Sequence, residues 1–238
     1  MKILLILSLW LTVSARAQTP AEIIKKSDEA RLPSGDISVT VHVRDFKKRV
    51  LEKDTTYKVI SKDAVMSLVD TIAPQRQKGR KLLMIQNDLW FFTPDIKRPA
   101  RVSFQQKLTG EVANGDISRT NFAGDYNATI VKTDKIKGRT AWVLDLKAAR
   151  TGVTYAAIKY WVEQKTFMPI QAEFFAVSGK FLKRAIYSKP INALGAQRIS
   201  SVLIQDAIQP ANESIIHYKD HKREVLHESF FNKDNLAQ

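Results

Sequence analysis

The sequence predicts a mainly β protein built on one large antiparallel sheet of about ten or eleven strands. Short segments in which apolar and polar residues alternate, separated by turn residues, follow one another from residue 37 to residue 222. Their meander-like connections need no crossover helices, which favours antiparallel pairing. A sheet of this size must curl or close on itself, and the alternation alone equally allows a closed barrel or a sandwich.

The N-terminus has the features of a secretory signal peptide. Met1-Lys2 gives a positive start, residues 3–13 are almost uninterrupted apolar sequence, and Ala15-Arg16-Ala17 is an A-x-A cleavage site. The apolar run is too short to span a bilayer. We therefore expect cleavage between Ala17 and Gln18, which leaves residues 18–238 as a single exported, soluble domain.

Charge and cysteine content limit the possible functions. The 238-residue chain has 38 Lys and Arg against 24 Asp and Glu, and loss of Lys2 and Arg16 with the leader lowers its formal net charge from +14 to +12. Such a balance attracts anions, and because export disfavours nucleic acid, we expect transient contact with a membrane surface or an acidic partner. The lack of cysteine excludes disulfides, thiol catalysis and thiolate metal sites.

A helix is predicted at the start of the mature chain, over residues 19–31. Thr19 can cap it, Pro20 occupies the first helical position, and Glu22 completes a capping box. The helix should end before Pro33. The residues of its narrow apolar side, which we expect to pack on the sheet, are Ile23, Ile24, Ser27 and Ala30.

Three strands follow this helix. Residues 37–44 alternate strictly, residues 51–61 return after the basic hairpin tip Lys47-Lys48-Arg49, and residues 64–72 form the third strand. The residues on the apolar face of the first strand are Ile37, Val39, Val41 and Val43. Those on its opposite face are Ser38, Thr40, His42 and Arg44.

The central stretch of the chain, residues 79–126, predicts a covered cavity. Its first half reads as three short strands over residues 81–86, 89–93 and 98–104. Its second half, residues 105–126, is polar and rich in small residues, with irregularly spaced apolar side chains, so we expect a loop with a short helix over an apolar surface. A sheet with such a cover is one way to enclose an apolar ligand.

The remaining strands are predicted at regular spacing, each with one apolar face and one mixed face. They comprise residues 128–134, 141–148, 156–164, 170–178, 180–188, 198–208 and 214–222. Residues from Phe230 onward have few organising signals and are expected to fray.

No catalytic or metal-binding motif stands out in the sequence. There is no nucleophile elbow, Walker loop or dinucleotide-binding glycine pattern. Glu163 and Glu173, on neighbouring predicted strands, are the best candidates for a carboxylate pair, but a solvated sheet face explains them better. His217 and His221 could share a face, but the basic residues around them disfavour a divalent cation. We therefore predict no enzymatic activity, no metal and no cofactor.

Several motifs carry a family resemblance. They are Gly79-Arg80-Lys81, Asp88-Leu89-Trp90, Arg98-Pro99-Ala100-Arg101, Asn114-Gly115-Asp116-Ile117, Asn121-Phe122-Ala123-Gly124-Asp125-Tyr126, Lys159-Tyr160-Trp161-Val162 and Ala172-Glu173-Phe174-Phe175-Ala176-Val177-Ser178-Gly179-Lys180. With these the chain resembles the LolA-like family of outer-membrane lipoprotein-sorting proteins, and within it the branch found beside RND-type exporters. The resemblance covers most of the chain after the leader.

The resemblance implies a fold and a function. The fold is a half-open barrel with an N-terminal helix and a short helical lid over the concave face. The function is that of a non-enzymatic carrier or accessory protein in the periplasm of a Gram-negative bacterium, which binds a lipid or lipoprotein acyl chains for transport to, or maintenance of, the outer membrane. An inner-membrane RND-type exporter is an implied partner. The alternative is an interaction or sensor protein with a solid core.

Strand alternation and the expected lid give a list of candidate site residues. Those expected to line the apolar cavity are Trp90, Phe92, Phe104, Leu108, Ile117, Phe122, Tyr126, Trp142, Leu144, Tyr160 and Phe174. Those expected to contact a headgroup or a partner are Lys97, Arg98 and Arg101. Because each buried methylene contributes about 0.8 kcal/mol, acyl chains can be held by such a cavity without a charged or covalent site.

Overall fold

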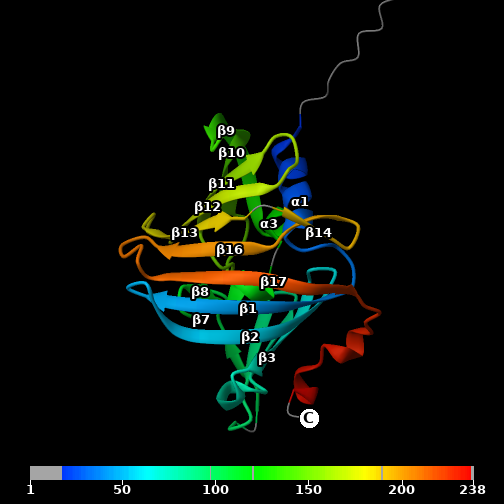
Figure 1. The fold of residues 1–238 in the computed structure, drawn as a ribbon. Coiled ribbons are helices and arrows are strands. Elements are labelled where there is room, and N and C mark those ends of the chain that lie inside the picture. Colours follow the sequence, from blue (N-terminus) through cyan, green and yellow to red (C-terminus); the bar gives the residue numbers. More distant parts are fainter. Residues whose placement is uncertain (1–17, 97, 120, 189, 237–238) are drawn as a thin grey trace, which may run out of the picture.

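The protein folds around one curled antiparallel sheet (Figure 1). The structure is a computed structural model that describes residues 18–96, 98–119, 121–188 and 190–236. Thirteen strands of the described chain form the sheet in the order β6-β5-β4-β3-β2-β1-β17-β16-β13-β12-β11-β10-β9. The sheet is not closed, because β6 and β9 remain as its edges. The predicted mainly β fold class, a half-open antiparallel sheet, is therefore confirmed.

Every strand of the sheet corresponds to a predicted segment, although the expected total of ten or eleven was too low. The strands of the first half are β1 (Ile37–Lys47), β2 (Val50–Lys62), β3 (Met66–Ala73), β4 (Lys81–Ile85), β5 (Asp88–Phe92) and β6 (Ala100–Val102). Those of the second half are β9 (Tyr126–Ile136), β10 (Arg139–Ala148), β11 (Ala157–Glu163), β12 (Pro169–Phe175), β13 (Phe181–Tyr187), β16 (Ser201–Asp206) and β17 (Glu213–Arg223).

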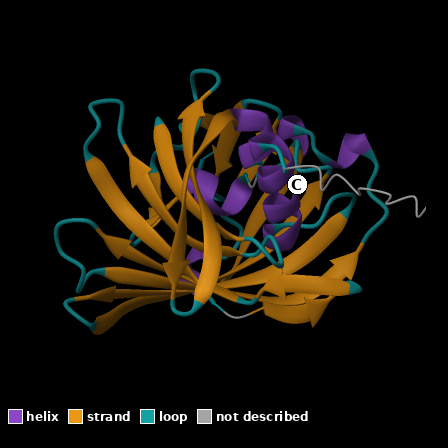
Figure 2. Ribbon diagram, turned by 90° about the horizontal axis from the view of Figure 1, so that it is seen from above, coloured by secondary structure: helices purple, strands orange, loops and turns teal. Residues whose placement is uncertain are grey.

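The N-terminal helix forms where its capping residues place it. Helix α1 (Pro20–Arg31) begins after Thr19, whose hydroxyl accepts a hydrogen bond from the backbone N–H of Glu22 at 3.3 Å, while the Glu22 carboxylate accepts one from the backbone N–H of Thr19 at 2.9 Å. Its buried side faces the interior of the curl, where Ser27 and Tyr160 share a hydrogen bond of 2.8 Å. Figure 2 shows a group of helices inside the curve of the strands.

Alternation along the strands divides the apolar residues into a concave and a convex set. On β10 and β11, Leu144 and Tyr160 belong to the main core under the helices, whereas Val143 and Trp161 belong to a separate cluster on the convex face. Ile170 joins that convex cluster, contrary to simple alternation, because the register of β12 shifts opposite Trp161 and Val162. Both faces of the sheet therefore carry apolar clusters.

Two predicted strands differ from the observed ones. The segment 98–104 shrinks to the three residues of β6, because Ser103 and Gln106 close a turn directly after it. The segment 198–208 is divided at Ser200 into β15 (Ala196–Ile199) and β16. Strand β15 pairs with β14 (Pro190–Ala193) in a separate hairpin. Strand β14 was not predicted.

The C-terminal segment is packed rather than frayed. It contains the short helices η2 (Glu228–Phe230) and η3 (Lys233–Asn235), and it follows β17 across the convex face (Figure 1). Phe231 and Leu236 are buried there against Leu83 and Phe92. The expectation of fraying was wrong because two apolar residues, widely spaced in a polar tail, are enough to anchor it to an apolar sheet face.

Replacement of Phe231 tests this anchoring. Because Phe231 is 4% exposed and its neighbour Phe230 is 44% exposed, Phe231→Ala should lower the free energy of unfolding by about 3–5 kcal/mol through lost burial and a cavity. Phe230→Ala is the matched control and should change it by less than about 1 kcal/mol. Urea denaturation measures both, and equal effects would contradict the packed tail.

Candidate functional site

The concave face is covered by the segment between β6 and β9, which we call the lid (residues 103–125). It contains the hairpin β7 (Lys107–Thr109) and β8 (Val112–Ala113), and the short helices α2 (Asn114–Ser118) and α3 (Phe122–Asp125). The short helical lid of the predicted fold is therefore present. Together with α1, it lies within the curl of the sheet (Figure 2).

The space directly under α1, α2 and α3 is nearly filled. Its free volume is about 60 Å³, which holds no more than a few water molecules at roughly 30 Å³ each. Tyr126, Tyr155 and Tyr187 project into it, and the guanidinium of Arg31 lies 3.7 Å from the ring centroid of Phe122. The expectation of a large apolar cavity under the helices was therefore wrong for this part of the interior.

A larger groove lies beside it, between the β7 end of the lid and strands β2 to β6. Its volume is about 390 Å³, within the range of roughly 300–1,000 Å³ typical of ligand pockets. Its apolar lining residues, hereafter the groove wall, are Tyr57, Val69, Leu82, Phe91, Val102 and Leu108. Its polar lining residues are Thr71, Gln77, Arg80, Lys81, Gln106, Lys107 and Asn114.

Helix α2 separates the groove from the filled interior. Asn114 lines the groove, while the next three residues line the interior. Gly115 permits this placement, because a Cβ atom there would lie 2.0 Å from the Thr154 hydroxyl. Glycine at position 115 is thus a packing requirement of this part of the lid.

Asp116 accepts three hydrogen bonds, which hold α2 to strand β13, to the loop before β11 and to its own N-cap residue. Its carboxylate accepts from the Lys183 ammonium at 2.6 Å, from the Tyr155 hydroxyl at 2.6 Å and from the backbone N–H of Ala113 at 2.8 Å. Lys183 also donates to the backbone carbonyl of Glu111 at 2.7 Å. Burial raises the pKa of Tyr155, so its hydroxyl keeps the proton that it donates.

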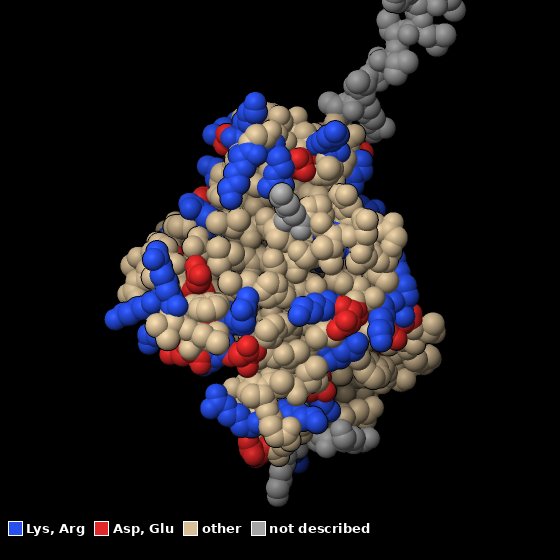
Figure 3. Space-filling model, viewed as in Figure 1, with Lys and Arg blue, Asp and Glu red and all other residues tan. Residues whose placement is uncertain are grey.

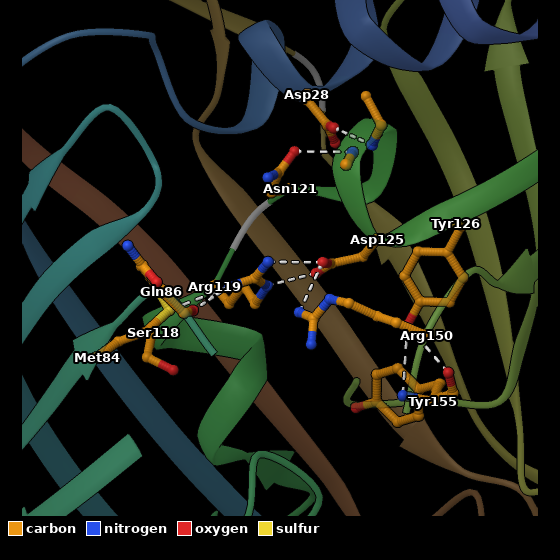
Figure 4. A network of polar contacts seen from close by, with 12 residues as sticks. Asp28, Met84, Gln86, Ser118, Arg119, Asn121, Asp125, Tyr126, Arg150 and Tyr155 are labelled. Carbon is orange, nitrogen blue, oxygen red and sulfur yellow. Dashed lines mark hydrogen bonds and ion pairs between the residues drawn. The ribbon is translucent and has the colours of Figure 1, made fainter. Parts of the chain in front are cut away.

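Asp125 forms a second anchor at the other end of the lid (Figure 4). Its carboxylate pairs with Arg119 and, at 2.8 Å, with Arg150. Arg119 also donates to the backbone carbonyl of Gln86 at 2.6 Å, in the turn between β4 and β5. One buried carboxylate therefore joins the lid, the sheet and the loop after β10.

Two further carboxylates complete the attachment. Asp28 of α1 accepts a hydrogen bond from the backbone N–H of Ala123 at 2.8 Å (Figure 4). Asp45 of β1 accepts from the hydroxyls of Thr109 and, at 2.6 Å, Ser214. The lid is thus attached at both ends by charged groups taken out of water, where loss of one partner is costly.

Burial raises the pKa of Asp28 to about 7, although the Arg31 guanidinium at 3.1 Å and the backbone N–H of Ala123 oppose this. The folded protein therefore holds a proton that the unfolded chain releases at lower pH. As the pH rises from about 4 to 7, this carboxyl should make folding progressively less favourable.

The variant Asp28→Asn tests this linkage. The stability of the wild type relative to Asp28→Asn should fall by about 4 kcal/mol at most between pH 4 and pH 8, and level off above pH 8. Urea denaturation of both proteins at several pH values measures the difference. A flat profile for Asp28→Asn would contradict the assignment.

Most of the residues predicted for the cavity lie on the concave side. Those buried in the main core are Phe104, Ile117, Phe122, Tyr126, Leu144, Tyr160 and Phe174, with Leu108 and Trp142 packed against them. Among them, only Leu108 lines the groove, whereas Ile117, Phe122, Tyr126 and Phe174 line the filled interior. Nine of the eleven predicted residues therefore lie on the concave side of the sheet, but one of these nine lines the groove.

Trp90 and Phe92 were assigned to the wrong face. Both pack in the convex cluster beside the C-terminal segment, and it is Leu89 and Phe91 that face the main core. Strand β5 is apolar on both sides, so its own sequence has no alternation that fixes which face is which. The pairing of Phe91 with Leu82 on β4 supplies that information.

Arg98 and Arg101, predicted for headgroup contact, do not line the groove. Arg101 pairs with Asp88 at the sheet edge, and Arg98 is exposed. Lys97 lies outside the described residues, as does Ala17 of the predicted cleavage site, whereas Gln18 is exposed where the described chain begins. The basic residues of the groove are instead Arg80 and Lys107, with Lys81 beside them.

The remaining candidates form no catalytic arrangement within the described residues. Glu173 faces Lys159 across the strands and pairs with Arg184 at 2.8 Å, while Glu163 faces Ala141. No group of three or more potential metal ligands occurs in this part of the chain. Nor does any described helix have the length and apolarity needed to cross a bilayer.

A third space, of about 360 Å³, lies on the convex face under the C-terminal segment. Its lining includes Lys58, Asp70 and Lys81 beside Leu68 and Leu236. Three charged residues line it, as three line the groove, but it has four apolar lining side chains where the groove has six.

The fold and the covered concavity define a class of half-open β-sheet proteins with a helical lid, and comparisons with known proteins agree. A family model described as "Uncharacterized protein" matches residues 63–238. A LolA superfamily protein from Nitrosomonas europaea is 37% identical, with a TM-score of 0.87, over 92% of this chain and 99% of that chain. The chain therefore belongs to the LolA superfamily. No curated protein matches it.

Two more distant structures share the fold. One, described as an outer membrane lipoprotein-sorting protein domain, is from Vibrio parahaemolyticus; it is 19% identical, with a TM-score of 0.77 over 92% of this chain and 98% of that chain. The other is a DUF1329 family protein from Desulfovibrio piger, 16% identical, with a TM-score of 0.77 over 91% of this chain and 97% of that chain.

Proposed function

We propose that this protein is a non-enzymatic lipid carrier or accessory protein that holds an acyl chain in the groove. The observation that carries this proposal is the groove itself, with about 390 Å³ of free volume and a wall of six apolar side chains. Binding of hydrocarbon there requires only shape and removal of apolar surface from water, at about 0.8 kcal/mol for each methylene.

The size of the groove suggests one chain rather than several. Its volume lies near the lower end of the range for ligand pockets. Entry of a second chain would require α2 to move, so that the filled interior opens. The contacts that resist this movement are those of Asp116 with Lys183 and Tyr155, so the proposal assigns to them the role of keeping the empty carrier closed.

The charges at the groove favour an anionic headgroup. Arg80 and Lys107 are exposed at its lining, although Lys107 also contacts Glu111 at 3.3 Å. A phosphate or carboxylate at the end of a bound chain would find these cations near it. Arg98 and Arg101, at the sheet edge, remain candidates for contact with a partner.

Family membership and the predicted signal peptide support a periplasmic location for this carrier. A signal peptide over residues 1–17 would export residues 18–238, and a relative of the same fold is described as a lipoprotein-sorting domain. We infer that the protein acts in the periplasm of a Gram-negative bacterium, in transport to, or maintenance of, the outer membrane.

One observation favours a second candidate function. Because the interior under the helices is nearly filled, the chain could instead be an interaction or sensor protein that binds no cargo. Its partner would then be a protein, such as an RND-type exporter. The two functions differ in whether lipid accompanies the purified protein.

Native mass spectrometry of protein purified from its own periplasm separates them. The carrier function predicts a bound species with the mass of a lipid, which organic extraction releases and identifies. Protein that carries no lipid after gentle purification, and that takes up none from added fatty acid, would exclude a carrier.

The variant Leu108→Trp tests the location of the site. Leu108 projects into the groove from the lid, so a Trp there should occupy the groove and weaken binding of dansyl-undecanoic acid at least tenfold. The matched control is Leu68→Trp, in the convex space of similar volume, which should leave the affinity within about twofold. Weakening by Leu68→Trp alone would place the ligand on the convex face and contradict the groove.

A further inference from the structure

Three connecting loops meet at one end of the sheet. They are the turns between β1 and β2, between β12 and β13, and between β16 and β17, at the left of Figure 1. The backbone N–H of Arg49 donates to the carbonyl of Ala211 at 3.0 Å, and that of Ala207 donates to the carbonyl of Leu182 at 3.1 Å. The three loops are therefore neighbours, and we call them the tip surface (residues 47–51, 176–180 and 207–212).

Each of the three loops exposes large apolar side chains. Val177 is 91% exposed, Ile208 is 71% exposed, and Val50 and Leu51 are 68% and 51% exposed. Isolated exposed apolar residues are ordinary, but a group on three adjacent loops is not. Turns usually carry small polar residues, and these side chains contribute little to the packing of the fold. Their exposure on three adjacent loops indicates contact with another molecule or surface.

The first loop adds positive charge at the same place. Lys47, Lys48 and Arg49 are exposed there, with Lys180 on the second loop. Lys48 and Arg49 adopt positive φ angles of 50° and 67°, in a hairpin turn where Asn and Gly are the residues that fit most easily. Figure 3 shows Lys and Arg side chains projecting from this end, with uncharged and acidic residues around them.

The acidic residues nearby flank the tip surface, whose own residues include four cations and no acid. Asp206 accepts hydrogen bonds from the backbone N–H groups of Ile208 and Gln209, at 2.8 and 2.7 Å, and Glu213 accepts one from the side chain of Gln205 at 3.2 Å. Glu52 and Asp54, on the strand that follows the first loop, are exposed as well. The tip surface thus combines projecting apolar side chains with an excess of cations.

We propose that the tip surface docks the protein on a bilayer that contains anionic lipids. Val50, Val177 and Ile208 enter the boundary between headgroups and acyl chains, and the cations of the first two loops contact phosphates. Shallow apolar insertion combined with basic residues is how peripheral proteins bind such membranes. This surface is separate from the groove and from Arg98 and Arg101, so the proposal does not depend on the carrier function.

The absence of cysteine permits a direct test. The mature protein is prepared with a single cysteine, as Val50→Cys, Val177→Cys or Ile208→Cys, and labelled with an environment-sensitive dye. Vesicles of phosphatidylethanolamine and phosphatidylglycerol should shift the emission of all three labels to the blue, and vesicles of phosphatidylcholine alone should shift it less. The control is Val225→Cys, which is 101% exposed and follows β17 at the opposite end of that strand; its emission should not change.

Vesicle flotation measures the contribution of each part. The triple variant Val50→Ser/Val177→Ser/Ile208→Ser should bind anionic vesicles at least tenfold more weakly, while the control Val131→Ser/Val225→Ser binds as the wild type does. The variant Lys47→Gln/Lys48→Gln/Arg49→Gln should lose the preference for anionic vesicles and its sensitivity to salt.

Two results would overturn the proposal. One is wild-type protein that does not float with anionic vesicles, and the other is an equal response of the label at position 225. Because Leu108→Trp blocks the groove and leaves the tip surface intact, its unchanged flotation would separate membrane docking from cargo binding.

Discussion

The closed form of this protein depends on four aspartates that fix the lid to the rest of the fold. Asp28, Asp45, Asp116 and Asp125 come from α1, β1, α2 and α3, and each accepts hydrogen bonds from a different part of the chain. Apolar contacts alone would keep the lid on the concave face without fixing its position, because they are not directional. Hydrogen bonds in a buried site are directional, and removal of one partner of a buried ion pair leaves an unpaired charge. The geometry of the groove therefore depends on them.

This constraint explains why, on the concave face, the larger free volume lies in the groove and not under the helices. The carboxylates hold α1, α2 and α3 close above β9 to β17, where tyrosines and Arg31 fill the interior. The β7–β8 hairpin is held at its tip, where Thr109 contacts Asp45, and the groove remains between this hairpin and β2 to β6. The lid is therefore fixed at Thr109, Asp116 and Asp125, and the larger free volume lies beside α2.

The sequence predicted the order and length of the elements better than the direction of their side chains. Strict alternation along β1 identified Val39 and Val41 as core residues, because one face there is polar. On β5 that contrast is missing, and Trp90 and Phe92 were placed on the wrong face. The attachment of the lid was hidden for another reason: Asp116 and Asp125 have partners, Lys183 and Arg150, that lie 67 and 25 residues away. The curl of the sheet brings these partners together, and the alternation of apolar and polar residues does not predict that curl. The burial of Phe231 against the convex face also depends on the curl of the sheet.

The central claim is that hydrocarbon lies between the β7 end of the lid and strands β2 to β6. Crystals grown with a fatty acid that carries bromine at its methyl end test this most directly, because anomalous scattering locates the bromine without regard to the surrounding density. The account predicts a bromine peak against Tyr57, Phe91 and Leu108 of the groove wall. A peak only under the C-terminal segment, beside Leu68 and Leu236, would contradict it.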